Sequence, residues 1–115
     1  MTLIDEWIER LQLDNWTIRV NENCKPDIMD VKDVWGDTVI DAVNKAARID
    51  IVNPSCVSDR LIPFDFEKVL VHELLHIKFY LLMQDGGQLH YNYAHQILDE
   101  MAVALVDAKR YIEIK

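Results

Sequence analysis

The fold of this protein depends on one stretch of sequence, Asp65-Phe66-Glu67-Lys68-Val69-Leu70-Val71-His72-Glu73-Leu74-Leu75-His76-Ile77-Lys78-Phe79-Tyr80-Leu81-Leu82. Asp65 is a typical helix N-cap and Glu67 a favourable first-turn residue, so we expect a helix from this point to about Met83 or Gln84, before Asp85-Gly86-Gly87. Apolar residues point in nearly every direction around its axis. The stretch therefore predicts a central, mostly buried helix in which ionisable residues are conspicuous.

The segments on either side of this helix predict an α+β fold. Periodicity and turn residues indicate a helix over 3–11 capped by Thr2, a strand over 16–21, a loop over 22–33, strands over 38–43 and 46–52, and a last helix over 89–111. Asn44-Lys45 predicts an antiparallel hairpin between the second and third strands, and Arg48 and Asp50 predict one exposed face on the third. We expect a short, mostly antiparallel sheet of three or four strands packed on the central helix.

Length and composition favour a single domain over residues 1–115, since 13.5 kDa and a 50% hydrophobic content suffice for one core. A formal net charge of −8 argues against nucleic acid as a partner. No apolar run approaches the roughly 20 residues that span a bilayer, so no membrane association is expected, and the start lacks the features of a secretory signal. Cys24 and Cys56 form no CxxC pair, which favours free thiols and a cytoplasmic location.

The central helix carries His72-Glu73-Leu74-Leu75-His76, an HExxH motif. Two histidines four positions apart project from one helix face and can bind one metal ion, and Glu73 beside them can act as a general base. Imidazole ligands favour Zn2+, and a catalytic zinc site has three protein ligands with a fourth position open. One alternative is that both histidines face solvent on a surface stripe with Glu73. Another is a metal-free helical scaffold in which the histidines are hydrogen-bonded core residues.

A third ligand is expected from the last helix. His95, Asp99 and Glu100 are the candidates there, and His90 is expected in a solvated turn. On a helical wheel His95 lies nearest to the apolar face, which favours it, with Glu100 or Asp99 as alternative third ligands. Asp99, one turn after His95, could instead orient an imidazole ring.

In this motif the chain resembles the small zincin-like metallopeptidases of phages and prophages, distantly related to SprT-like and ImmA/IrrE-type proteins. The resemblance also includes residues 16–20, 46–51 and 95–102. It implies a minimal zincin-like fold, zinc-dependent peptide hydrolysis, metal ligation by His72 and His76, and Glu73 as base. In the glutamate-type zincins a ligand follows the motif after eighteen residues, and His95 stands at that distance, after residues 77 to 94.

The chain is therefore predicted to be a zinc metallopeptidase whose substrate is a protein or peptide. The substrate would lie along one arm of the 38–52 hairpin as an added strand. Tyr80, Tyr91, Tyr93 or Arg48 could stabilise the oxyanion. The alternative function is a zincin-fold protein-binding module, acting in antirepression or anti-defence, with a structural metal and little hydrolysis.

Overall fold

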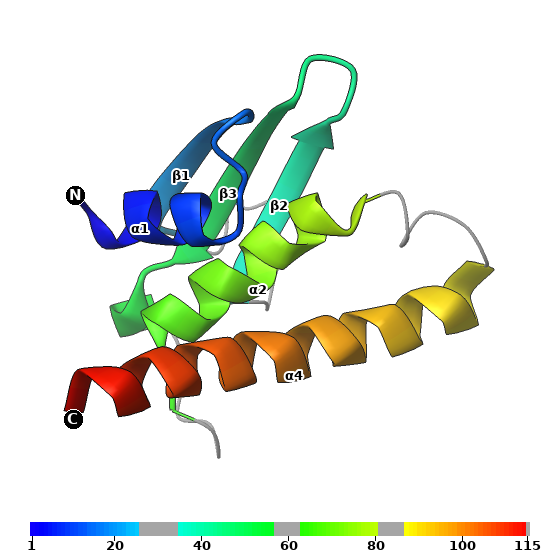
Figure 1. The fold of residues 1–115 in the computed structure, drawn as a ribbon. Coiled ribbons are helices and arrows are strands. Elements are labelled where there is room, and N and C mark those ends of the chain that lie inside the picture. Colours follow the sequence, from blue (N-terminus) through cyan, green and yellow to red (C-terminus); the bar gives the residue numbers. More distant parts are fainter. Residues whose placement is uncertain (26–34, 57–62, 81–86, 115) are drawn as a thin grey trace.

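The computed structural model describes residues 1–25, 35–56, 63–80 and 87–114, without the side chains of Cys24, Cys56 and residues 87–91 (Figure 1). The described elements follow the chain as α1 (Leu3–Arg10), β1 (Thr17–Cys24), β2 (Gly36–Asp41), β3 (Ala46–Val52), the short 3-10 helix η2 (Pro54–Cys56), α2 (Phe66–Lys78) and α4 (Gly87–Ile114). The predicted α+β class is confirmed.

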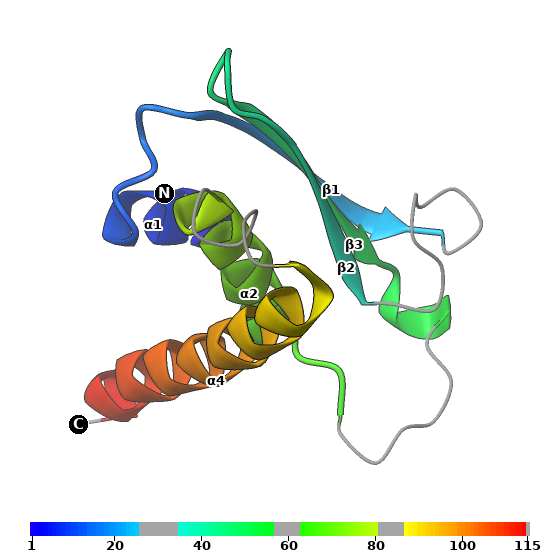
Figure 2. The same cartoon turned by 90° about the vertical axis from the view of Figure 1, so that its right-hand side faces the viewer.

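Helix α2 lies between the sheet and α4, and α1, α2 and α4 are on one side of the sheet (Figure 2). Its N-cap is Asp65, as predicted, because the Asp65 carboxylate accepts a hydrogen bond of 3.2 Å from the Lys68 N–H. The buried residues of α2 are Glu67, Val69, Leu70, Val71, His72, Glu73, Leu74, Leu75 and Ile77. Both faces of the helix are therefore covered, as its apolar composition predicts.

The sheet has the order β1-β3-β2 and is mixed, so the prediction of a mostly antiparallel sheet was wrong. β2 and β3 form the predicted antiparallel hairpin, in which Thr38 pairs with Ile49, but β1 runs parallel to β3. Alternation of polar and apolar residues reports which face of a strand is buried and carries no information on its direction. This topology leaves β2 at one edge of the sheet, next to α2.

Several element boundaries differ from those predicted. β1 extends to Cys24, so residues 22–24 belong to a strand, whereas residues 26–33 of the predicted loop lie outside the described residues. β2 begins two residues earlier than predicted, and the turn spans residues 42–45 because the Asp41 carboxylate accepts the Asn44 N–H at 3.2 Å.

The helix ends also differ. α2 ends at Lys78 instead of Met83 or Gln84, α4 runs from Gly87 to Ile114, and the predicted stop at Asp85-Gly86 lies outside the described residues. Although α4 has 28 residues, no helix in the described ranges combines the length and apolar character needed to cross a bilayer.

The predicted exposed face of β3 was wrong at Asp50, which is buried. Its carboxylate accepts hydrogen bonds from Asn21 Nδ2 at 2.7 Å and from Arg48 Nε at 3.2 Å. These three side chains lie on the sheet face opposite to α2, because they alternate with core residues such as Ile49. Hydrogen bonds offset the desolvation of the buried carboxylate, an interaction that the alternation pattern does not reveal.

A buried ion network ties α1, the start of α2 and the end of α4 together. Glu67 Oε2 accepts hydrogen bonds from Trp7 Nε1 at 2.7 Å and from Lys109 Nζ at 2.6 Å. Arg110 contacts Glu67 Oε1 at 3.0 Å and both carboxylate oxygens of Asp65, at 2.7 and 3.0 Å. Because Glu67 and Lys109 are both buried, removing either charge leaves the other poorly solvated.

Glu67→Gln is expected to lower the free energy of unfolding by about 3 kcal/mol, the usual effect of removing one partner of a buried ion pair. Denaturant titration measures this change. The control is Asp107→Asn, since Asp107 is exposed and lies 3.3 Å from Lys68, so that variant should lose less than about 1 kcal/mol. Equal effects of the two substitutions would contradict a special role for Glu67.

The stability difference between wild type and Glu67→Gln should depend on pH. Burial tends to raise the pKa of Glu67, but hydrogen bonds from Lys109, Trp7 and Arg110 outweigh it and hold that pKa below its ordinary value of 4.5. A lowered folded-state pKa gives stability that is complete above the unfolded-state pKa and is lost as the pH falls through the folded-state value. The difference in the free energy of unfolding between wild type and Glu67→Gln, measured between pH 7 and 3, should therefore be constant above about pH 5.5. It should shrink below about pH 4.5.

Candidate metal centre

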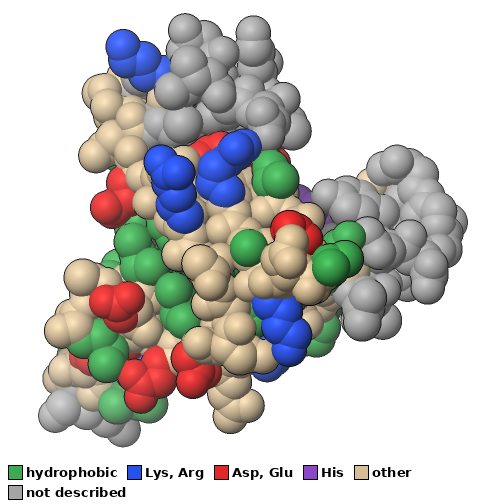
Figure 3. All heavy atoms as spheres, turned by 90° about the horizontal axis from the view of Figure 1, so that it is seen from above, with side chains coloured by type: hydrophobic (Ala, Val, Ile, Leu, Met, Phe, Trp, Pro, Cys, Tyr) green, Lys and Arg blue, Asp and Glu red, His purple; other side chains and the backbone are tan. Residues whose placement is uncertain are grey.

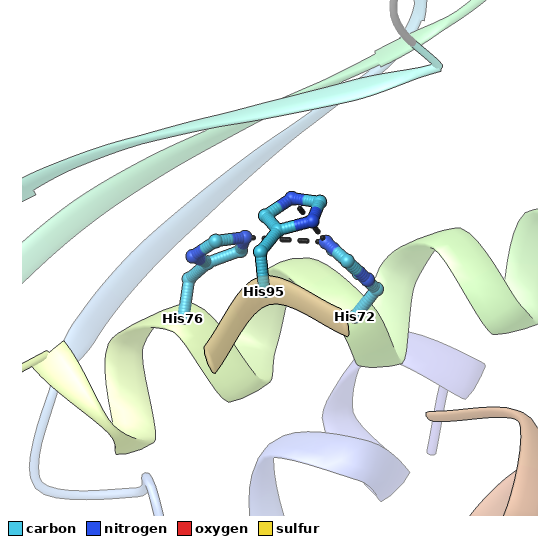
Figure 4. Close-up of side chains that lie close together, drawn as sticks. All are labelled: His72, His76 and His95. Carbon is cyan, nitrogen blue, oxygen red and sulfur yellow. Dashed lines mark hydrogen bonds between the residues drawn. The ribbon is translucent and has the colours of Figure 1, made fainter. Parts of the chain in front are cut away.

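Three imidazole rings from two helices converge beside the sheet (Figure 4). His72 and His76 stand one turn apart on α2, and His95 reaches them from α4. The His72 Nε2 atom lies 3.2 Å from His95 Nε2 and 3.2 Å from His76 Nε2. Ligand atoms of all three residues lie within 4.8 Å of one another.

This geometry fits a zinc ion. Zinc–nitrogen bonds of about 2.1 Å in a tetrahedral site place the ligand nitrogens about 3.4 Å apart, close to the separations around His72. Burial, followed by the neighbouring imidazoles, lowers the pKa of His72 and of His76. The rings are thereby kept neutral, which is the form that binds a metal.

The candidates for a third ligand occupy different places. The structure brings His95 to the other two histidines, whereas Asp99 Oδ1 lies 3.4 Å from His72 Nδ1, the ring nitrogen that faces away from the cluster. Asp99 is thus placed to orient the ring of His72. Glu100 is exposed on α4 and is not part of the cluster, and the side chain of His90 lies outside the described residues.

Glu73 is buried next to this cluster, and its carboxylate faces β2. Its Oε1 atom accepts a hydrogen bond of 2.6 Å from the hydroxyl of Thr38, and its Oε2 atom lies 4.0 Å from His72 Nε2. The pKa of Glu73 is raised to about 7, mainly by burial; the hydrogen bond from Thr38 opposes the rise, and the negative charge of Asp37 adds to it. A carboxyl with this pKa is well matched to proton transfer near neutral pH.

Sequence reasoning missed the two β2 residues that contact Glu73. A Cβ atom on Gly36 would lie 2.9 Å from Val69 Cγ1 and 3.0 Å from both Cγ and Oε2 of Glu73, so only glycine fits without a shift. Thr38 lies two positions further, on the same face of the strand. The available signal was a rare glycine, one of three in the chain, followed at strand spacing by a hydroxyl residue.

Two of the four candidates for stabilising an oxyanion point away from the cluster. Arg48 binds Asp50 on the sheet face opposite to α2. Tyr93 is 61% exposed and, two positions before His95, lies on the far side of α4. Tyr80 is half-buried just after α2, and the side chain of Tyr91 lies outside the described residues.

The cluster is accessible from outside. His76 and His95 are partly exposed, whereas His72 is buried. In Figure 3, which views the molecule from above, a small area of histidine is visible at the border with the residues that the structure does not describe. A ligand can thus approach the rings of His76 and His95, whereas Glu73 beside them is buried.

Comparison with known proteins gives no match: neither family models, nor curated proteins, nor solved structures show significant similarity to this chain. The function is therefore inferred from the residues and their geometry.

Gly36→Ala should destabilise the protein by about 1–3 kcal/mol, because the added methyl group overpacks the contact between β2 and α2. The free energy of unfolding checks this. Val69→Ala removes one of the clashing atoms, so Gly36→Ala should have a smaller effect in that background. A Gly36→Ala variant with the same free energy of unfolding as wild type would contradict the close approach of β2 to Glu73.

Proposed function

We propose that this protein is a zinc-dependent metallopeptidase with a minimal zincin-like fold, similar to the small phage and prophage enzymes that its sequence resembles. One observation carries the proposal: the Nε2 atoms of His72 and its two histidine neighbours converge beside the buried carboxylate of Glu73. Three imidazoles leave one position of a tetrahedral ion open, which distinguishes catalytic from structural zinc sites.

His72, His76 and His95 are the proposed ligands, and a zinc ion held by them would polarise a peptide carbonyl and acidify a water molecule. Glu73 supplies the base. It accepts the proton of the attacking water through the carboxylate oxygen nearer to the histidines, Oε2, and then donates it to the leaving amine. Its burial keeps bulk water away from this transfer and raises its pKa into the range where it can act in both directions.

The proposed substrate is an extended protein or peptide segment. In the hairpin, β3 lies in the middle of the sheet and β2 lies at its edge. The backbone N–H and C=O groups on one side of β2 therefore point away from β3. An extended segment added to this edge gains main-chain hydrogen bonds. The same strand contacts Glu73 through Gly36 and Thr38, which brings such a segment close to the base.

Metal content tests the ligand set. Protein purified without added metal, then offered one equivalent of Zn2+, should hold about one zinc per chain by elemental analysis. His72→Ala, His76→Ala and His95→Ala should each lose most of it, because each removes one of three ligands. Glu100→Gln is the matched control on α4 and should retain zinc. A wild type without zinc, or a His95→Ala variant that binds zinc like wild type, would contradict the proposed site.

Glu73→Gln separates hydrolysis from binding. The variant should keep its zinc and lose about 10²–10⁴-fold in the cleavage rate of an unfolded protein such as fluorescein-labelled casein, since the base is removed and the ligands remain. Unchanged cleavage would reject Glu73 as the base. If zinc is bound but neither wild type nor variant cleaves, the protein is better described as a binding module with a structural metal.

A further inference from the structure

The two oxygens of the Glu73 carboxylate have different surroundings. Oε1 accepts the Thr38 hydroxyl at 2.6 Å, within the range of a charge-assisted O–H···O⁻ hydrogen bond. Oε2 lies in the space left by the missing side chain of Gly36 and is the oxygen nearer to His72 Nε2, at 4.0 Å. The carboxylate is thus held at one oxygen and directed towards the histidines with the other.

Thr38 is well suited to hold one oxygen in place. Its backbone is fixed by antiparallel pairing with Ile49 in the middle of β2. A β-branched side chain has few χ1 rotamers, so a threonine hydroxyl is better defined in space than a serine hydroxyl. The contact joins two elements far apart in sequence, β2 and α2.

We propose that Thr38 is a positioning residue, which fixes the orientation of the Glu73 carboxylate so that Oε2 faces a ligand bound at the three histidines. This inference rests on the proposed function and extends it to a residue outside the HExxH motif. Thr38 does not itself contact the reacting atoms. Thr38 acts by preventing rotation of the Glu73 carboxylate about its Cγ–Cδ bond. Such a rotation would turn both oxygens away from the ligand in a fraction of the molecules.

The orientation matters because a base is effective only within hydrogen-bond reach of the proton that it accepts. Without the hydroxyl, Oε1 would remain buried with one partner fewer, and the carboxylate would turn to find another. Gly36 leaves space beside Oε2 and offers no donor side chain, so it does not hold the carboxylate in one orientation. Thr38 is therefore the contact that selects the productive orientation.

Acetohydroxamate binding to the Co2+-loaded protein tests this role without requiring turnover. Acetohydroxamic acid can chelate a metal ion through its carbonyl and hydroxyl oxygens, Glu73 would accept the proton of its hydroxyl group, and the visible absorption of Co2+ reports binding. The variants are Thr38→Val, which has the same shape but no hydroxyl, Thr38→Ser, which keeps it, and Glu73→Gln. Melting temperatures monitor folding, and Thr38→Ala replaces Thr38→Val if the latter does not fold.

Thr38→Val is expected to weaken acetohydroxamate binding about tenfold, the effect of losing one hydrogen bond to a charged group, while Co2+ binding stays unchanged. Thr38→Ser should remain within about threefold of wild type, because the donor is retained. In the Glu73→Gln background, Thr38→Val should have little further effect, since both substitutions act on the same contact.

The possible failures are distinguishable. If Glu73→Gln weakens acetohydroxamate binding and Thr38→Val does not, the positioning role is overturned and the proposed function stands. The positioning role is likewise overturned if Thr38→Val weakens binding equally in the wild-type and Glu73→Gln backgrounds. If wild type binds neither Co2+ nor Zn2+, the proposed function fails, and the positioning role fails with it.

Discussion

The burial of α2 between the sheet and α4 is the constraint on which the rest of the structure depends. A helix covered on both faces can hold ionisable groups only where neighbouring elements supply partners. For His72 the partners come from α4, and for Glu73 the hydrogen-bond donor comes from β2. The candidate metal centre is thus the place where α4 and β2 meet the polar residues of α2, and its geometry follows from their packing.

The position of His95 depends on contacts at the other end of α4. Glu67 and Asp65 at the start of α2 bind Lys109 and Arg110 near the end of α4. About 22 Å of helix separate these cations from His95, at a rise of 1.5 Å per residue. The ion network sets the register of α4 along α2 and so helps to bring His95 to the other histidines.

Periodicity and capping residues were enough to predict the α+β class and the buried helix with Asp65 as its cap. His95, the favoured one of three candidates on the last helix, lies beside His72 and His76, and its role as a metal ligand stays a prediction. Strand direction was missed, because alternation does not encode it. Thr38 and its neighbour Gly36 were missed because a contact between a strand and a helix 35 residues later leaves no local pattern, and the rarity of glycine was the only signal.

In the proposed site, three imidazoles hold one zinc ion and leave one coordination position open. X-ray absorption spectroscopy of the zinc-loaded protein measures this directly, because it reports the number, type and distance of the atoms bound to the metal. The predicted spectrum shows three imidazole nitrogens, from His72, His76 and His95, and one further oxygen at about 2.0–2.1 Å. A sulfur neighbour at about 2.3 Å, or a shell with only one or two imidazoles, would contradict the proposed three-histidine site.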